Sequence, residues 1–271
     1  MSKSVLMTSK IENFFKKLLA PLNIKKGDVV MVSLSFWKIV MSIKSDKKMI
    51  LSTFHNCLLD IIGKEGTIVA PCHSLNLCGT NIPFDVNKTS SYERGEYSEY
   101  LRSFKNSKRS VHPFASYIAI GNKANYVTKN TSRFAYGPYS PESRMIKLNA
   151  KRLGIGVDVN NVTTIHHVEQ SVGVPYRYMK EFIHPILVKD KIKKEPFYLY
   201  VRYNNIGLTS DYSMKLFSKI ENKLKIKKSY LDRVDAHSYS LKKYFNLSII
   251  EFVNDPFIWA KKIPKLKPYR K

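Results

Sequence analysis

A histidine and a glutamate three residues apart are the strongest candidates for chemistry in this chain. Residues 162–169 read VTTIHHVE, after an apolar stretch and shortly before Gly173. If a helix begins here, His166 and Glu169 share one face, because residues three apart on a helix are neighbours. A carboxylate beside an imidazole fixes its tautomer and stabilises the imidazolium, so the pair predicts a general base. His167 points elsewhere.

The same spacing also arises by chance or as a structural hydrogen bond, so it does not establish catalysis alone. A zinc site is a weaker interpretation, since the zinc-protease pattern needs His-Glu-x-x-His. Cys72 and Cys78 also lack paired metal-ligand spacing. We therefore expect no metal.

The overall charge narrows the class of partner. The 271 residues include 46 Lys and Arg against 21 Asp and Glu, a formal charge of +25. Such an excess favours phosphates, nucleic acid or acidic surfaces. Because 36 of the 46 basic residues are Lys, a compositional bias of the source explains the excess equally well.

Cysteine content and hydropathy indicate the compartment. Three cysteines, an odd and small number, argue against a disulfide framework and for a reducing environment. The first residues lack an unbroken apolar core of a signal peptide, and no later stretch approaches the ~20 apolar residues of a membrane span. We predict a soluble, cytoplasmic protein.

The elements that must position these residues alternate between strand and helix. Apolar periodicity predicts a helix over 11–19 behind a Ser9-x-x-Glu12 capping box, a strand over 29–36, a helix over 49–62 and a strand over 66–71. This alternation is typical of an α/β protein with a parallel or mixed sheet covered by helices. Further helices are expected near 96–104, 122–127 and 142–148, and strands at 116–120 and 153–157.

Beyond Pro175 the pattern changes to longer strands. Strands are expected over 176–188 and 196–203, then helices near 212–224 and 238–245. No Gly/Ser-rich linker separates this part and no internal repeat is present. We expect one domain over residues 1–271, with 176–271 as a closely packed C-terminal lobe.

Seven segments that are unconvincing singly form a specific pattern in their order and spacing. They are GDVVMVSLS at 27–35, GTIVAP at 66–71, FD at 84–85, RSVHP at 109–113 with Ser116 and Gly121, GPYSP at 137–141, GxGV at 154–157 and TxxHxxE at 163–169. Together they resemble the aminoglycoside 3-N-acetyltransferase family. The resemblance covers residues 27–173, and two departures are Ser33, where the family usually has His, and Val162, where it has Asn.

The resemblance implies a three-layer α/β/α fold with a central mixed sheet, unrelated to the common acetyltransferase superfamily, and an N-acetyltransferase that uses acetyl-CoA as acyl donor. His166 would act as general base and Glu169 would orient it. Thr163 is expected either to present its hydroxyl to the thioester oxygen or to cap the helix. The residues implied to line the cofactor are Ser35, Phe36, Arg109, Ser110 and Val111, and those assigned to the acceptor are Asp85 and His73. An exposed turn is the structural alternative for the segment 109–113.

The acceptor is predicted from charge. Aminoglycosides are polycations and favour an acidic cleft, whereas a nucleotide-linked amino sugar suits a basic protein. We therefore expect a nucleotide-linked amino sugar used in surface polysaccharide biosynthesis, with an aminoglycoside, and hence antibiotic resistance, as the alternative. An acidic pocket built from Asp85, Glu93, Glu96 and Glu99 would favour the alternative. Oligomeric state is not predicted.

Two readings other than an active enzyme remain open. Tyr198, Tyr200 and Tyr203 in a basic region are suited to stacking on nucleic acid, but their alternation with Leu199 and Val201 is more typical of a sheet core. We expect no nucleic-acid partner. Ser33 and Val162 also leave open a fold that binds the cofactor without turnover.

Overall fold

The computed structural model describes residues 3–91, 95–204 and 213–264. Within them one seven-stranded mixed sheet forms the centre of the molecule. Its strands, in spatial order, are β3 (Lys108–Arg109), β4 (Tyr117–Gly121), β2 (Thr67–Pro71), β1 (Val29–Leu34), β5 (Lys151–Ile155), β9 (Val234–Ser240) and β8 (Lys227–Leu231). β1 pairs in parallel with β2 and β5, whereas β4 and β9 run antiparallel to their neighbours.

Helices cover both faces of this sheet. α1 (Lys3–Leu19), the 3₁₀ turn η1 (Ala20–Leu22), α2 (Phe36–Ile43), α3 (Lys47–Ile62) and α4 (Glu96–Arg102) pack on one face. α5 (Ala124–Thr128), α6 (Pro141–Lys147), α7 (Thr164–Val172), α8 (Lys215–Leu224) and α9 (Leu241–Asn254) pack on the other. Val30 and Val32 of β1 belong to the first core and Val29 and Met31 to the second, since alternate residues of a strand face opposite sides. The expected three-layer α/β/α arrangement is confirmed.

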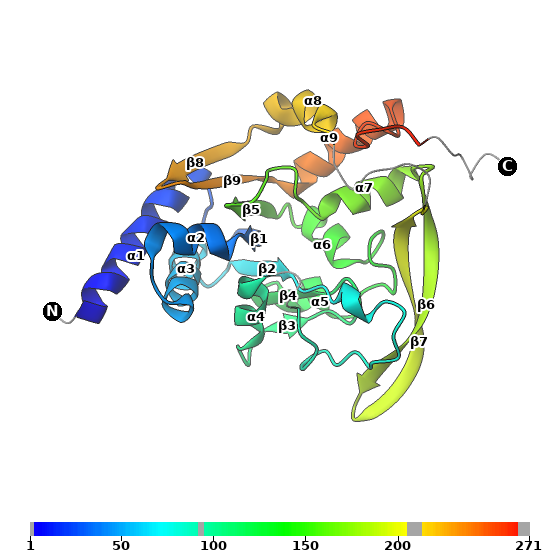
Figure 1. The fold of residues 1–271 in the computed structure, drawn as a ribbon, viewed down its shortest axis with the longest axis horizontal. Coiled ribbons are helices and arrows are strands. Elements are labelled where there is room, and N and C mark those ends of the chain that lie inside the picture. The colour runs from blue at the N-terminus through cyan, green and yellow to red at the C-terminus, as the bar shows by residue number, and fades with distance from the viewer. Residues whose placement is uncertain (1–2, 92–94, 205–212, 265–271) are drawn as a thin grey trace.

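A separate hairpin lies beside the main sheet. β6 (Arg177–Val188) and β7 (Lys191–Arg202) pair antiparallel along their full length, and Figure 1 shows them as a long ribbon along one side of the molecule, below the end of α7. Ile186, Phe197 and Leu199 form a third core with residues of the loops before β4 and α6, Phe114 and Tyr136 among them. The hairpin therefore packs on loops at one edge of the sheet. A further 3₁₀ turn, η2 (Leu75–Leu77), lies in the loop after β2.

Three local predictions are wrong. Ser9 lies inside α1, which begins at Lys3, so it is not the helix cap. β1 ends at Leu34, and Phe36 starts α2 instead of ending the strand. Ser238 lies in β9 and not in a helix.

The error at Ser238 has a physical reason. β9 pairs with β5 on one side and with β8 on the other, where Ser238 lies opposite Leu153 and Lys227, and the Ser238 hydroxyl donates to the Leu22 carbonyl. Such long-range pairing overrides local preference. The following helix α9 begins one turn later, where Ser240 accepts a hydrogen bond from the backbone N–H of Lys243.

Among residues 3–91, 95–204 and 213–264, no helix has both the length and the apolar character needed to cross a membrane.

Candidate active site

The central pair of the site lies on α7. Thr163 occupies the N-cap position of this helix, and Gly173 ends it in the left-handed conformation at φ 71°. The helix follows β5 by a short loop, and it packs through Ile165 and Val168 into the core on that face of the sheet. Thr164, His167 and Glu169 are buried as well, so the polar side chains of this helix must find their partners inside the protein.

The predicted His166–Glu169 contact is present. His166 Nδ1 lies 2.8 Å from Glu169 Oε2. The other oxygen of Glu169, Oε1, accepts a hydrogen bond of 2.8 Å from the Tyr176 hydroxyl. Arg177 Nε lies 2.9 Å from the same Oε1 in an ion pair, without the alignment of a hydrogen bond. One carboxylate therefore connects α7 to the first residue of β6.

Hydrogen bonding and a neighbouring positive charge keep Glu169 ionised despite its burial. Its side chain is fully buried, and burial alone would raise the pKa of the carboxyl group. The hydrogen bond with His166 and the charge of Arg177 outweigh that effect, so the pKa lies below its usual value. Arg177, with 8% of its side chain exposed, is the buried counter-charge.

The imidazole of His166 has one side open to solvent. Its side chain is 29% exposed, and its ring contacts the rings of Tyr136 at 5.5 Å and Trp259 at 5.9 Å between centroids. Arg177 Nη2 is 3.4 Å from Nδ1. Because the carboxylate oxygen is closer to Nδ1, we place the proton on Nδ1 and leave Nε2 as the acceptor. The arrangement can take a proton from a nucleophile that reaches Nε2.

Thr163 makes no side-chain hydrogen bond to its own helix. Its hydroxyl donates instead to Oε1 of Glu142 at 2.8 Å, and it lies 3.0 Å from the Tyr117 hydroxyl. Glu142 also accepts hydrogen bonds from Tyr117 and Thr164. Burial raises the pKa of Glu142, because these hydrogen bonds offset only part of the desolvation.

The residues predicted at the cofactor fall into two groups. Ser35 is the N-cap of α2, directly after β1, and Phe36 follows it. Gly156 lies against Ser35 with φ 63°, where an added Cβ would be 3.2 Å from the Ser35 Cβ and 3.1 Å from the Lys38 side chain. The ends of β1 and β5 thus meet at a place that only a residue without a side chain fits.

Arg109 is used by its own chain. Its guanidinium donates to the Ser116 hydroxyl, the Thr89 carbonyl, the Cys72 carbonyl and the Ser74 hydroxyl. It therefore holds the segment 72–89 against β3 and β4. A cofactor phosphate would have to bind a guanidinium that already donates to these four oxygens. Arg109 therefore has a structural role that the sequence did not reveal.

Ser110 and Val111 differ in exposure. Ser110 is fully buried, and its hydroxyl accepts a hydrogen bond of 2.9 Å from the Tyr117 backbone N–H. Val111 is 38% exposed and lines a cavity of about 400 Å³. The predicted acceptor residue Asp85 lines the same cavity, between the loop of 84–88 and the tip of the hairpin.

The two predicted acceptor residues lie in different surroundings. Asp85 uses Oδ1 to accept from the backbone N–H groups of Asn87 and Lys88, as in an Asx turn. His73 is 1% exposed and packs edge-on against the Tyr117 ring at 5.3 Å. Tyr117 thus contacts both His73 and Thr163, whereas Asp85 belongs to the hairpin side.

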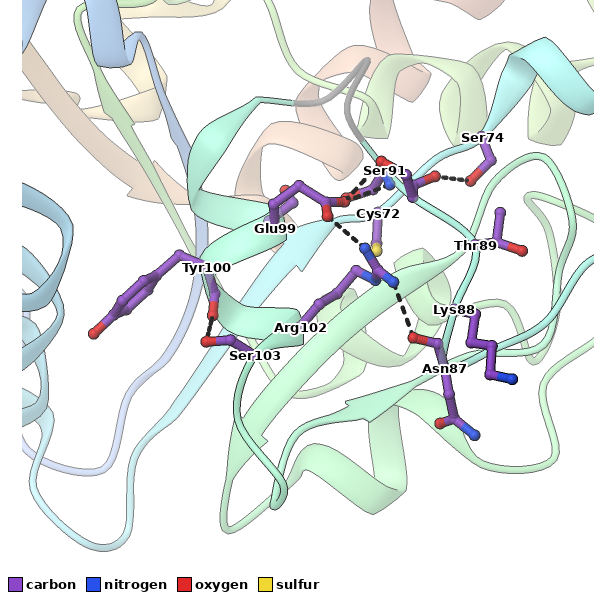
Figure 2. A network of polar contacts seen from close by, with 12 residues as sticks. Cys72, Ser74, Asn87, Lys88, Thr89, Ser91, Glu99, Tyr100, Arg102 and Ser103 are labelled. Carbon is purple, nitrogen blue, oxygen red and sulfur yellow. Dashed lines mark hydrogen bonds and ion pairs between the residues drawn. The ribbon is translucent and has the colours of Figure 1, made fainter. Parts of the chain in front are cut away.

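The acidic residues considered for a cationic acceptor are partly neutralised. Glu96 forms an ion pair with Lys47. Figure 2 shows Glu99 directed at Ser91 and Arg102, with the hydroxyl of Ser91 at 2.7 Å from its Oε1. The pKa of Glu99 is lowered, because these contacts outweigh its desolvation. Glu93 lies outside the described residues.

The aromatic residues considered for nucleic-acid stacking pack within the chain. Tyr198 stacks on Phe134 at 4.5 Å, and the Tyr200 hydroxyl donates to the Val174 carbonyl. Tyr203 lies 4.7 Å from the ring of Tyr178. Across residues 3–91, 95–204 and 213–264, no three His, Cys, Asp or Glu side chains form a group suited to a metal ion.

Sequence reasoning missed four residues of the site. Tyr176 and Arg177 directly follow Pro175, where the sequence indicated only the start of a strand. Glu142 directly follows the quoted segment 137–141, and Tyr117 lies in a predicted strand. Glu142, Tyr176 and Arg177 are polar residues at the boundaries of predicted elements, which was the only signal in the sequence. No neighbouring residue indicates that they contact α7.

The sequence of this chain is similar to those of a known enzyme family. The aminoglycoside 3-N-acetyltransferase family profile matches residues 31–249. Aminoglycoside N(3)-acetyltransferase IX of Micromonospora chalcea is 27% identical over 188 residues, which are 63% of this chain and 65% of that protein. The match with the corresponding enzyme III of a Salmonella species covers 64% of each chain at 24% identity. The chain thus spans just under two thirds of the length of these relatives.

Solved structures share this fold over most of the chain. A structure titled as AAC-IIIb in a binary complex with CoASH superposes with a TM-score of 0.77 at 19% identity, covering 93% of this chain and 98% of that one. AAC-VIa bound to sisomicin gives 0.73 at 18% identity, covering 90% and 96%. With a profile match over most of its length and this shared architecture, the chain belongs to the aminoglycoside 3-N-acetyltransferase family.

Proposed function

We propose that this protein is an acetyl-CoA-dependent N-acetyltransferase that acts on an amine of an amino sugar. The observation that carries the proposal is the partly exposed imidazole of His166, held by a buried and ionised Glu169. When bound, acetyl-CoA supplies the activated thioester. The protein must then provide a base for the amine and hold both reactants in place.

One proton moves from the acceptor amine to the departing thiolate by way of His166. As the amine nitrogen forms its bond to the acyl carbon, His166 Nε2 takes one amine proton, and the Glu169 carboxylate stabilises the imidazolium through Nδ1. When the carbon–sulfur bond breaks, the same proton passes to the departing thiolate. General-base assistance of this kind contributes about 10²–10⁴ in rate.

The donor site is proposed at the ends of β1 and β5 and at the segment before β4. Ser35 and Phe36 at the start of α2, beside the Gly156 backbone, offer a place for close backbone approach. Val111 supplies an exposed apolar surface, and the buried hydroxyl of Ser110 braces this segment by accepting from the Tyr117 backbone N–H. A solved relative whose title records CoASH supports acetyl-CoA as the donor.

The first candidate acceptor is an aminoglycoside. This differs from the preference that charge alone suggested, because the relatives are named as aminoglycoside N(3)-acetyltransferases and solved relatives are titled with sisomicin. A nucleotide-linked amino sugar is the second candidate. It is favoured by the charge of +25 and by the neutralisation of Glu96 and Glu99.

The test is a thiol-release screen with acetyl-CoA over aminoglycosides and nucleotide-linked amino sugars. Thiol release with kanamycin-like compounds supports the first candidate, and release only with nucleotide-linked sugars supports the second. His166→Gln is the control, and it should abolish release while the protein stays folded. A folded wild-type protein that binds acetyl-CoA in calorimetry and acetylates no amine of the panel would contradict the proposal and favour a binding role.

A further inference from the structure

A second buried carboxylate lies behind the first turn of α7. Glu142, on α6, is fully buried, and its partners are three hydroxyl groups instead of a cation. Oε1 accepts from Thr163 at 2.8 Å and from Tyr117, and Oε2 accepts from Thr164 at 2.9 Å. The donors come from β4 and from the start of α7, so one side chain joins three elements.

The hydrogens of this cluster can be counted. A hydroxyl group has one hydrogen to donate and two lone pairs that accept. When Glu142 is ionised, its two oxygens take the hydrogens of Tyr117, Thr163 and Thr164. Thr163 Oγ1 then has no hydrogen left for an acyl oxygen, and only its lone pairs remain available to a substrate.

Exposure distinguishes the two threonines. Thr164 is fully buried, whereas Thr163 is partly exposed. Thr163 precedes His166 by three residues, which places both side chains on one face of the helix start. The His166 backbone N–H also donates to the Thr163 carbonyl at 3.0 Å, so the two residues form one rigid turn.

We infer that Glu142 is a positioning residue for acetyl transfer, which acts through Thr163. The carboxylate fixes the Thr163 hydroxyl hydrogen inward, so that Oγ1 accepts one N–H of the acceptor amine while His166 takes the other proton. The amine nitrogen is thus held by two acceptors with its lone pair toward the acyl carbon. This inference rests on the proposed acetyltransferase function.

A double-mutant cycle tests the inference. Glu142→Gln keeps the shape of the side chain but replaces one acceptor oxygen by an NH₂ donor, and Thr163→Val keeps the shape but removes the hydroxyl. Each single variant should lower kcat by about tenfold to a hundredfold, the scale of a misplaced reactant. The KM for acetyl-CoA should not change. The double variant should be no slower than the slower single variant, because both remove the same interaction.

A matched control separates this role from stability. Thr128→Val removes another buried threonine hydroxyl, which donates to the Ala124 carbonyl on α5. It should lower the thermal midpoint and leave kcat unchanged. Thr163→Ser restores the hydroxyl and should recover kcat relative to Thr163→Val. If Glu142→Gln does not fold, Glu142→Asp completes the same cycle.

Three results would overturn the inference. The first is full kcat in Glu142→Gln, and the second is multiplied losses in the double variant, which would mean that the two residues act separately. The third is a wild-type protein that acetylates no amine. That result removes the proposed function as well, whereas the first two leave it in place.

Discussion

Glu169→Gln removes a charge that a buried guanidinium needs as well as the imidazole. The carboxylate is fully buried, and Arg177 is 8% exposed at 2.9 Å from it. Removing one partner of a buried pair costs roughly 3–5 kcal/mol, since the other charge stays desolvated. With about 2–4 °C of thermal midpoint per kcal/mol in a domain of roughly this size, we expect the midpoint to fall by about 6–20 °C.

His166→Gln is the matched variant, because it removes the base without stranding a charge. The His166 side chain is 29% exposed, so we expect the midpoint to change by less than about 3 °C, as for most substitutions at the surface. Its kcat should fall by about 10²–10⁴. Glu169→Gln should combine a comparable loss of kcat with the large loss of stability.

Thermal unfolding followed by circular dichroism, with thiol release measured well below both midpoints, separates the two effects. In wild type, the lowered pKa of Glu169 means that its stabilising contribution is present above the pKa of the unfolded state and is lost as the pH falls through the folded value. Part of the acid sensitivity should therefore disappear in Glu169→Gln. A Glu169→Gln protein with the wild-type midpoint would refute the reasoning, because it would show that Arg177 does not depend on this carboxylate.

Three further predictions concern the frame around the site. Burial lowers the pKa of four histidines to about 4 or about 3. The folded state therefore has its full stability above pH 6.5, and it loses about 1.4 kcal/mol per pH unit for each histidine as the pH drops toward those pKa values. Urea unfolding at several pH values should show close to four protons taken up on unfolding near pH 5, and an unchanged free energy of unfolding from pH 7 to 5 would contradict this. These histidines are His55, His112, His167 and His237. Gly154→Ala would place a Cβ 2.2 Å from the His237 ring, so it should lower the free energy of unfolding by about 1–3 kcal/mol. His237→Ala should suppress most of that loss, and an equal loss with and without His237→Ala would rule out the clash. Arg109→Lys cannot reproduce the forked contacts to the segment 72–89, so limited proteolysis should cut there faster than in wild type, and an unchanged cleavage pattern would remove this bracing role.

Local patterns in the sequence were sufficient for the layers and for the central pair. The apolar run of β1, buried on both faces, indicated an internal strand, and the spacing of His166 and Glu169 indicated their contact. Both depend only on periodicity over a few residues. The segment around Gly154 was recognised as a motif, but the sequence did not show why a glycine is needed there. The His237 ring lies opposite Gly154 on β9, and that pairing joins residues 83 positions apart in the chain.

What the sequence could not predict depends on contacts between distant elements. Arg177 pairs with Glu169 only because the chain turns sharply after α7, and Glu142 reaches Thr163 only because α6 packs beside α7. Glu142 and Arg177 look like ordinary surface residues when taken alone. The same is true of Arg109, whose type and position suit a phosphate ligand, while its four hydrogen bonds within the chain appear only when the fold is known.

The link from Glu169 to the first residue of β6 makes the proposed His166–Glu169 catalytic pair depend on parts of the chain that follow it. Tyr176 and Arg177 meet the carboxylate, and Arg177 also donates to the Tyr200 carbonyl across the hairpin. A truncated protein that ends soon after Gly173 would keep every residue of the 163–169 motif and still lack a competent base. Activity should consequently emerge late in synthesis, only after the ribosome has released the whole hairpin, and no shorter fragment should serve as a minimal enzyme.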